Sequence, residues 1–246
     1  MARTYKTEAV VLRSMRYAEA DRILHLYTAD RGRIGAIAKG IRKTTSRVGG
    51  RLEPLGHVEL LLHAGSGELH TVTGVELVRP HNAVRESPYR LAVGLIGAEA
   101  MLRLFPEQEA NERAFTALTR FLDRLDEIET RAPAPPALDP LGLSFQLKLL
   151  WVSGYRPHLE SCVECGSVEG LVGYLPAAGG AVCRDCGPGS IALTSAGVRA
   201  IQTLVATPLA EASEAGLTAS GAREALAIVR ASYEHQGGFR LRTLSA

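Results

Sequence analysis

Residues 57–79 read HVELLLHAGSGELHTVTGVELVR. In the first half of this stretch Val58, Leu60 and Leu62 alternate with polar or outward positions, which is the period-two pattern of a strand buried on one face. A second alternating set follows the Gly65-Ser66-Gly67 turn and consists of Leu69, Thr71, Thr73, Val75 and Leu77. The stretch therefore predicts a β-hairpin.

Three further strands are predicted upstream of this hairpin, at Glu8–Arg13, Arg22–Thr28 and Arg33–Lys39. Asp30-Arg31-Gly32 supplies a tight turn between the last two. Five short strands in about eighty residues predict a small closed barrel of the oligonucleotide-binding (OB) type. An SH3-like barrel fits the same periodicity almost as well.

Downstream of Pro80 and Pro88 the apolar spacing becomes helical, so we expect two domains, a barrel over 1–80 and a helical domain over 81–246. Leu91–Phe105 and Leu141–Val152 are apolar on most sides, as in helices buried in a bundle, and Trp151 is expected in the core. Amphipathic helices are predicted around Phe115–Leu125, with Asn111 as N-cap, and around Val198–Val205 and Leu226–Tyr233. The predicted fold class is thus a multidomain α+β protein.

The positive charge is concentrated in the barrel. Residues 1–80 hold 13 Lys and Arg against 8 Asp and Glu, a net charge of +5, and the other residues hold 15 against 18, a net charge of −3. Between Asp30 and Glu53 there is no acidic residue, and the basic residues are Arg31, Arg33, Lys39, Arg42, Lys43, Arg47 and Arg51. This run indicates a polyanion contact.

A solvated basic loop is the alternative interpretation of this run. Neighbouring glycines, which let phosphates approach the backbone, and the hydroxyl groups of Thr44, Thr45 and Ser46 favour nucleic acid. Gly35 and Gly40 imitate the spacing of a Walker A loop, but Ile41 stands where that loop requires lysine. An NTPase is therefore not expected.

The four cysteines of the chain fall into one pattern, Cys162-x-x-Cys165, seventeen residues, and Cys183-x-x-Cys186. Four thiolates at this spacing suit one tetrahedral Zn²⁺, and a site filled by four sulfur ligands leaves no position for catalytic water. We expect a structural zinc module over 159–189, embedded in the helical domain. An iron–sulfur cluster and four unligated cysteines remain as alternatives.

Composition excludes several protein classes. The chain has 246 residues, 46% hydrophobic and 22% charged, which is enough to bury a core and argues against disorder. No apolar run is long enough to span a bilayer, and the N-terminal charges leave no apolar signal-peptide region. We therefore expect a soluble, cytoplasmic protein without membrane contact.

Several segments resemble the RecO family of bacterial DNA repair proteins. They are RSMRYAEAD at 13–21, LHLYT at 24–28, AKGIRK at 38–43, and GYRP at 154–157 leading into Cys162-x-x-Cys165-Gly166. The resemblance spans nearly the whole chain, and the order of barrel, helical domain and four-cysteine module agrees with it.

The resemblance implies a non-enzymatic recombination mediator of the RecF pathway, associated with the nucleoid. Such a protein binds single- and double-stranded DNA, anneals complementary strands, contacts the single-stranded-DNA-binding protein SSB, and with RecR helps to load RecA. By the same match, the DNA contacts are Lys39, Arg42 and Lys43, with support from Arg13, Arg16, Arg31, Arg33 and Arg47.

Two other function classes stay open. A zinc-dependent nucleic-acid-processing enzyme would need an open metal position or paired carboxylates, and His57, His63 and His70 are expected to be merely exposed on the outer face of the hairpin. A zinc-ribbon protein of transcription or translation would need a basic cysteine module, yet residues 159–189 contain only Arg184 as a basic residue. Acidic residues of the helical part, including Glu107, Glu109, Asp123 and Asp126, are expected to form a solvated face.

Overall fold

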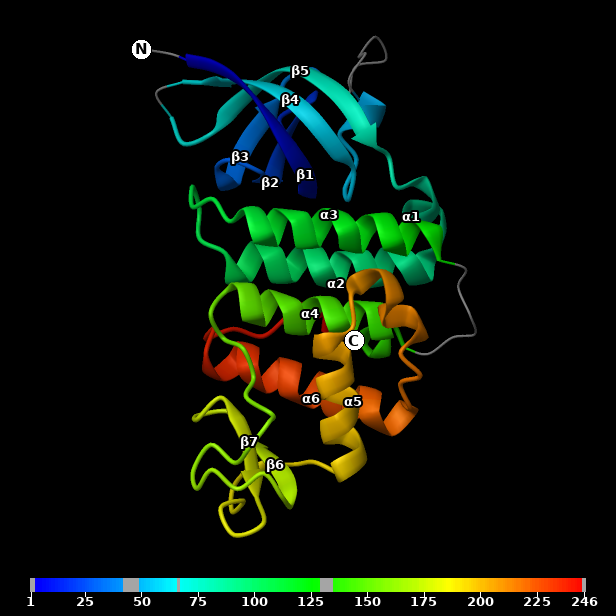
Figure 1. The fold of residues 1–246 in the computed structure, drawn as a ribbon. Coiled ribbons are helices and arrows are strands. Elements are labelled where there is room, and N and C mark those ends of the chain that lie inside the picture. The colour runs from blue at the N-terminus through cyan, green and yellow to red at the C-terminus, as the bar shows by residue number, and fades with distance from the viewer. Residues whose placement is uncertain (1–2, 42–48, 66, 129–134, 245–246) are drawn as a thin grey trace. The chain divides into compact units, whose positions relative to one another are not determined.

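The computed structural model describes residues 3–41, 49–65, 67–128 and 135–244, and it divides into two compact units, Met1–Glu127 and Ile128–Ala246. Figure 1 shows the first unit as a strand barrel with helices lying along one side of it. The first unit contains β1 (Arg3–Tyr17), β2 (Asp21–Thr28), β3 (Gly32–Ala38), a 3-10 turn (Gly49–Arg51), β4 (His57–Ala64), β5 (His70–Arg79), α1 (Asn82–Glu86), α2 (Pro88–Leu104) and α3 (Glu112–Glu127).

The five strands close into a barrel in the order β1-β2-β3-β5-β4. Neighbouring strands are antiparallel except β3 and β5, which pair in parallel through Ala36 with His70 and Ile37 with Thr71. The Greek-key order with one parallel pair is the OB arrangement, so the OB expectation is confirmed over the SH3-like alternative. β1 is long enough to pair with β4 along its first half and with β2 along its second half.

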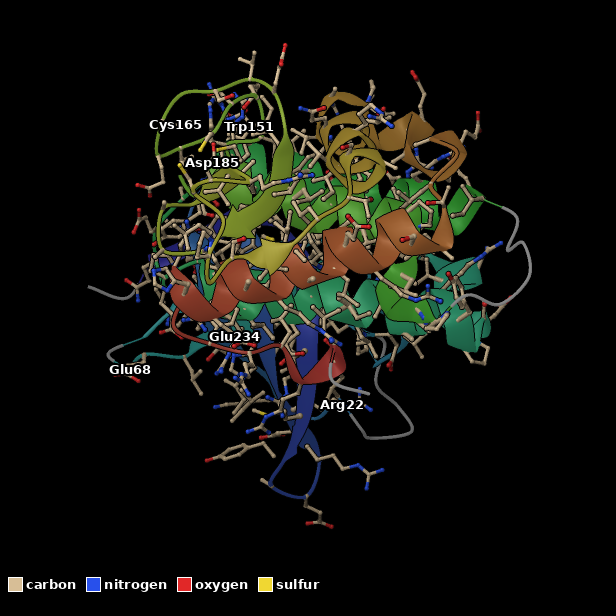
Figure 2. All side chains as sticks on the ribbon, turned by 90° about the horizontal axis from the view of Figure 1, so that it is seen from below. Arg22, Glu68, Trp151, Cys165, Asp185 and Glu234 are labelled. Atoms are coloured by element: carbon tan, nitrogen blue, oxygen red, sulfur yellow. The ribbon has the colours of Figure 1, made fainter. Side chains whose placement is uncertain are left out.

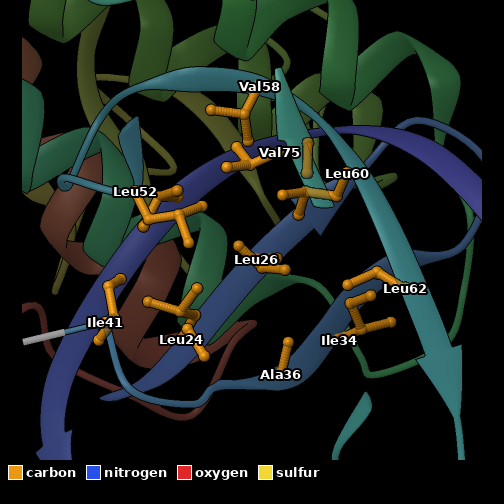
Figure 3. Packing of buried hydrophobic residues seen from close by; sticks show 13 residues of the cluster. Leu24, Leu26, Ile34, Ala36, Ile41, Leu52, Val58, Leu60, Leu62 and Val75 are labelled. Carbon is orange, nitrogen blue, oxygen red and sulfur yellow. The ribbon is translucent and has the colours of Figure 1, made fainter. Parts of the chain in front are cut away.

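The barrel core is built from side chains that alternate inward along each strand (Figure 3). Leu24 and Leu26 of β2 face Leu60 and Leu62 of β4, and all four are fully buried. Burial of each leucine stabilises the fold by about 2 kcal/mol relative to exposure. Because side chains alternate along a strand, these inward residues also determine which side chains point outward.

The predicted alternation in β5 is wrong in detail. Bulges between Leu61 and Leu62 and between His57 and Val58 shift the register of β5 against β4. Val75 is buried, as predicted, but beyond the bulge at Leu61 and Leu62 it is Val72 that packs against the core, in place of Thr71 and Thr73. Leu69 and Leu77 are 39% and 43% exposed. A bulge inserts one residue, which reverses the faces of the residues beyond it.

The helices of the first unit follow local signals. Asn111 accepts a hydrogen bond from the Ala114 N–H at 2.9 Å and caps α3, as expected. Two of the acidic residues expected on a solvated face instead make structural contacts. Asp123 lies 2.9 Å from the buried His81 imidazole, and Asp126 accepts from the Val84 N–H at the start of α1.

In the second unit two helices pack against α4, and a small sheet that carries cysteines follows α4 in the chain (Figure 1). Its elements are a 3-10 turn (Pro136–Leu138), α4 (Pro140–Val152), β6 (Leu171–Leu175), β7 (Gly180–Cys183), β8 (Ile191–Ala192), α5 (Ser195–Ala206), a 3-10 helix (Leu209–Glu214), α6 (Ala219–His235) and a 3-10 turn (Arg242–Leu244). The sheet has the order β7-β6-β8.

Trp151 is not in the core. It lies in the last turn of α4, its exposed fraction is 50%, and the Arg156 guanidinium carbon lies 5.1 Å from its ring centroid. The prediction was wrong because the apolar sequence of α4 runs to the end of the helix, whereas the chain already leaves the core there, at Ser153 and Gly154. None of the described helices combines the length and apolarity needed to cross a membrane.

Candidate nucleic-acid interface and metal centre

The outer face of β1, β2 and β3 carries two of the predicted DNA contacts. Because Leu24, Leu26 and Ile34 point into the core, His25 and Arg33 point outward. Arg13 is paired with His25 across β1 and β2, and His25 is paired with Gly35 of β3. Arg13, His25 and Arg33 therefore form one cationic patch on this face, which we call the strand-face patch.

Both arginines act on the histidine between them. Burial lowers the pKa of His25 below its usual value, and the positive charges of Arg13 and Arg33 lower it further. Glu107, which lies in the loop after α2, acts in the opposite direction. His25 thus faces two cations and one anion, and at neutral pH it is an uncharged hydrogen-bonding group.

Arg33 is held by an acidic loop. Its guanidinium lies 3.4 Å from the Glu107 carboxylate, and its main-chain carbonyl accepts a hydrogen bond from the Gln108 N–H at 2.9 Å. Arg33 and Glu107 also form an isolated parallel bridge. The predicted DNA contact Arg33 is therefore already paired with a carboxylate of its own chain.

Arg31 lies away from the strand-face patch, in the turn between β2 and β3. Its guanidinium carbon is 4.0 Å from the centroid of the Tyr5 ring, and Asp30 lies 3.5 Å from its Nε. A cation over an aromatic face is stabilised by the ring quadrupole. Tyr5 also hydrogen-bonds His70 at 3.0 Å, so Arg31 belongs to a second cluster, at the end of the barrel where β1 meets β4.

Arg16 and Lys39 lie toward the other end of the barrel. Arg16 is paired with Arg22 across β1 and β2, and Lys39 follows β3 directly. Arg13 and Arg16 are three residues apart on one strand, so their side chains project from opposite faces of the sheet. Within the described ranges Arg13, Arg16 and Lys39 are exposed and form no ion pair.

The other three predicted contacts, Arg42, Lys43 and Arg47, lie outside the described residues. The described residues on either side of this segment include the basic residues Lys39 and Arg51. Arg22 lies 3.5 Å from Glu53, and Arg51 donates to the Val75 carbonyl at 3.2 Å. Figure 2 labels Arg22 on the barrel.

Three residues of this interface were missed by the sequence reasoning, namely His25, Arg22 and Glu107. His25 had a usable signal, since it alternates with Leu24 and Leu26 and had to point outward. Glu107 had none, because it lies 74 residues beyond Arg33 in the sequence and the two meet only in the folded chain.

The histidines of the hairpin are less exposed than expected. His57 is 8% exposed, hydrogen-bonds Glu8 at 3.1 Å, and packs edge-on against Phe115 of α3. Burial lowers its pKa, although Glu8 acts against this shift. His63 and His70 are half-buried and hydrogen-bond Thr4 and Tyr5. Each of the three has a structural partner.

The four cysteines converge on one point in the second unit. Their Sγ atoms all lie within 4.8 Å of one another, and those of Cys165 and Cys183 are 3.7 Å apart. Four sulfurs around a tetrahedral ion at 2.3 Å would stand about 3.8 Å apart. Cys165 is exposed and Cys162 is buried, so the site lies at the surface of the module; Figure 2 shows Cys165 and Asp185 there.

Local backbone geometry prepares the cysteines for a cation. Cys162 and Gly166 close a tight turn in which the Gly166 N–H donates to the Cys162 carbonyl at 2.8 Å. Backbone N–H groups of Cys165 and Cys183 point at the Cys162 sulfur and lower the pKa of its thiol to about 6. Hydrogen bonds with Cys183 and Cys165 raise the pKa of Cys186 to about 12.

Without a cation the cluster therefore holds a mixture of thiolate and thiol. A bound divalent ion favours the deprotonated form of all four sulfurs, so these residues can hold a metal ion. In the part of the chain that the structure describes, this is the one group of Cys, His, Asp and Glu side chains close enough to do so.

Two family models cover the chain almost completely. "Recombination protein O N terminal" matches residues 1–81, and "Recombination protein O C terminal" matches residues 85–245. The chain belongs to the RecO family.

Individual RecO proteins align over nearly the full length. The DNA repair protein RecO of Rubrobacter xylanophilus is 40% identical over 236 residues, which covers 92% of this chain and 90% of the relative. The protein of the same name from Anaeromyxobacter sp. strain K is 34% identical over 242 residues, with 96% and 92% covered. That from Roseiflexus sp. is 33% identical, with 95% and 81% covered.

The RecO family thus accounts for both parts of the chain, the barrel and the helical region with its cysteines. RecO is a family of DNA repair mediators and is not a known enzyme class.

Proposed function

We propose that the protein is a recombination mediator that binds single- and double-stranded DNA through the basic surface of its barrel. The observation that carries this proposal is the strand-face patch, where exposed Arg13 and half-buried Arg33 flank His25 on the outer face of β1–β3. This is the strand face on which OB barrels take oligonucleotides. Lys39, and the sequence neighbours Arg42, Lys43 and Arg47, extend the positive charge beyond β3.

Affinity in this proposal is electrostatic. Each phosphate contact releases condensed counterions, so the logarithm of affinity falls with the logarithm of salt concentration by about 0.7 per contact on single strands. Five contacts would weaken binding roughly 100-fold between 50 and 200 mM salt. Aromatic residues are only 5% of the chain, which makes base stacking secondary.

Strand annealing follows from the same surface without a catalytic residue. Two complementary strands repel each other through their phosphates, and a basic surface that holds both lowers this repulsion while leaving the bases free to pair. No proton transfer or bond cleavage is needed. We therefore propose that the protein is not an enzyme.

The partners are proposed from family membership. RecR, SSB and RecA act with this protein in the proposal, in which it helps RecA to load on SSB-coated single strands. A cytoplasmic, nucleoid-associated location follows from binding to DNA.

Zinc is the metal that we propose for the cysteine site. Cys162, Cys165, Cys183 and Cys186 would hold one Zn²⁺, whose chemistry here is structural, because four thiolates complete its coordination. The ion would stabilise residues 159–189, a stretch rich in glycine. We likewise propose that the barrel at 1–80 is the DNA-binding domain and that 81–246 is the helical one.

A strand-annealing assay with and without SSB coating tests the function. Wild type should anneal complementary oligonucleotides, with binding that weakens steeply with salt, and Arg42→Glu/Lys43→Glu should bind and anneal at least tenfold more weakly. Arg223→Glu, an exposed charge reversal on α6, is the control and should behave as wild type. A salt slope near zero, or unchanged binding by the double variant, would contradict the proposal. Cleavage of the strands with added Mg²⁺ would instead indicate an enzyme.

A further inference from the structure

Glu107 lies beside the strand-face patch and places a negative charge of the protein itself next to Arg33. Its carboxylate is 3.4 Å from the Arg33 guanidinium, and its side chain is 61% exposed. The Nε of Arg33 is buried and has no hydrogen-bond partner among the described residues. The arginine therefore has a donor that this carboxylate leaves unused.

The loop that carries Glu107 is fastened to β3 through the backbone. Gln108 donates to the Arg33 carbonyl, and the main chain of Glu109 packs on Gly32, where a Cβ would stand 1.9 Å from the Glu109 oxygen. The backbone of the loop is thus held beside Arg33, and the exposed carboxylate can rotate away without disturbing it.

The neighbours of this ion pair are cationic or neutral donors. Arg13 is exposed and has no ion pair within the described ranges, and His25 lies between Arg13 and Arg33. A carboxylate and a phosphate offer a guanidinium the same kind of ligand, anionic oxygens that accept charge-assisted hydrogen bonds. The position of Glu107 beside Arg33 therefore marks where an external phosphate would bind.

We propose that Arg13, His25 and Arg33 form a phosphate subsite for a DNA backbone and that Glu107 occupies this subsite until a phosphate displaces it. This inference rests on the proposed DNA-binding function and adds an internal competitor to it. Arg13 and Arg33 supply the charge, His25 supplies a hydrogen-bonding group between them, and Glu107 sets the threshold that a ligand must exceed.

The competition is mild because the carboxylate partner of the ion pair, Glu107, is 61% exposed to solvent. Exposed pairs contribute little to stability, so a phosphate displaces Glu107 at a cost of about two- to fivefold in affinity. A single weak anion gains little from the exchange. A polynucleotide gains counterion release from every phosphate along it, so the carboxylate selects for extended ligands.

Glu107→Gln tests the proposal with Glu109→Gln as the matched control. Both variants remove one negative charge from the same exposed loop, but within the described ranges Glu109 forms no ion pair with a basic side chain. Binding of an oligothymidylate to the full-length protein is measured by fluorescence anisotropy between 50 and 200 mM salt. Glu107→Gln should raise affinity about two- to fivefold, and Glu109→Gln should leave it near the wild-type value.

A double-mutant cycle with Arg33 identifies the partner. Arg33→Gln and Arg13→Gln should each weaken binding and lower the salt slope by about 0.7. In the Arg33→Gln background, Glu107→Gln should have no further effect, because its competitor role requires the guanidinium. Thermal unfolding of each variant confirms that it is folded.

Equal gains from Glu107→Gln and Glu109→Gln would overturn the inference in favour of a general charge effect, as would an undiminished gain in the Arg33→Gln background. No gain from Glu107→Gln would also overturn it, while salt-dependent binding by wild type would leave the proposed function standing. Absence of oligothymidylate binding by every protein, wild type included, would instead remove the proposed function together with the subsite.

Discussion

Gly32 is the residue at which the barrel and the loop after α2 meet. Its φ is +64°, in the left-handed region, and it begins β3 directly after the turn at Ala29–Arg31. The Glu109 carbonyl lies where a side chain would be. One glycine thus permits both the turn and the close contact that places Glu107 next to Arg33.

Replacing this glycine should separate the loop from the strand. Gly32→Ala is expected to lower the free energy of unfolding by roughly 2 to 4 kcal/mol, because it adds left-handed strain and a clash with main-chain atoms. Gly65→Ala, with no atom near the added methyl and no positive φ, should change it by less than about 0.5 kcal/mol. Urea unfolding measures both; similar values for the two variants would show that the loop gives way freely.

His25 reports the charge of its neighbours. Burial and the two arginines hold its pKa below the usual 6.5. As the pH falls through 6.5, the imidazole is therefore protonated in the unfolded chain before it is protonated in the folded chain. His25 therefore costs stability below pH 6.5 and none well above it.

Arg13→Gln should raise the pKa of His25, since it removes one positive charge from β1 and leaves Arg33 and Glu107 in place. The variant should also lose less stability than wild type between pH 7.5 and 5.5. NMR titration of the imidazole gives the pKa, and Arg223→Gln on α6 is the control. An unchanged His25 pKa would mean that Arg13 points away from it.

Among the elements, α4 and α5 are joined by a half-buried amine. Lys148 of α4 donates from Nζ to the carbonyls of Leu204, Val205 and Thr207, at 3.2, 2.9 and 2.8 Å, where α5 ends. The last carbonyls of a helix have no partner within the helix, and a cation there also complements the helix dipole. Burial lowers the pKa of Lys148.

Lys148→Met should remove the donor from the Val205 and Thr207 carbonyls, while the Leu204 carbonyl keeps its hydrogen bond from the Ser144 hydroxyl. We expect the free energy of unfolding to fall by about 1 to 3 kcal/mol. Hydrogen exchange should show faster opening at the end of α5, with α1–α3 unaffected. Arg199→Met, an exposed change on α5, serves as the control and should have a small effect. Equal exchange at the end of α5 in both variants would argue that solvent replaces the amine.

The elements also show what the sequence could and could not predict. β2 and β3 follow from local alternation, since Leu24, Leu26, Ile34 and Ala36 are all buried. The full length of β1 did not, because its ends are polar and are strands only through pairing with β4 and β2. The bulges in β5 depend on the same long-range pairing.

The candidate sites divide in the same way. The cysteine spacing predicts the two sulfurs of each pair close together, since each pair is a local turn, and the fold, with Cys183 on β7 paired to β6, brings the two pairs together. The basic residues of the barrel form separate groups, because strand alternation and the two ends of the barrel decide their positions. A run of basic residues in the sequence contains no information about either factor.

At the scale of the whole molecule, the basic N-terminal region and the four cysteines of the proposed metal site belong to different compact units. Residues 1–80 carry the net charge of +5, while Cys162–Cys186 lie in the unit Ile128–Ala246. The cysteine module has its own short sheet, so loss of the metal should stay local.

A chelator should loosen residues 158–190 and leave the barrel folded. The proposed ion contributes on the order of 10 kcal/mol of binding energy to the folding of this stretch. Hydrogen exchange before and after chelation measures the change, and Cys162→Ser should reproduce it without a chelator. Equal loss of protection in β1–β5 would contradict a local role.

The barrel is closed by pairings that all lie within the first 79 residues, β1 with β4 and β3 with β5. During synthesis on the ribosome these partners are complete long before Cys186 is added, and at usual elongation rates the delay is roughly 5 to 20 s. A nascent chain can therefore expose a finished barrel while its four cysteines are still untranslated. If these cysteines hold zinc as proposed, zinc starvation in a growing cell should leave that early product intact.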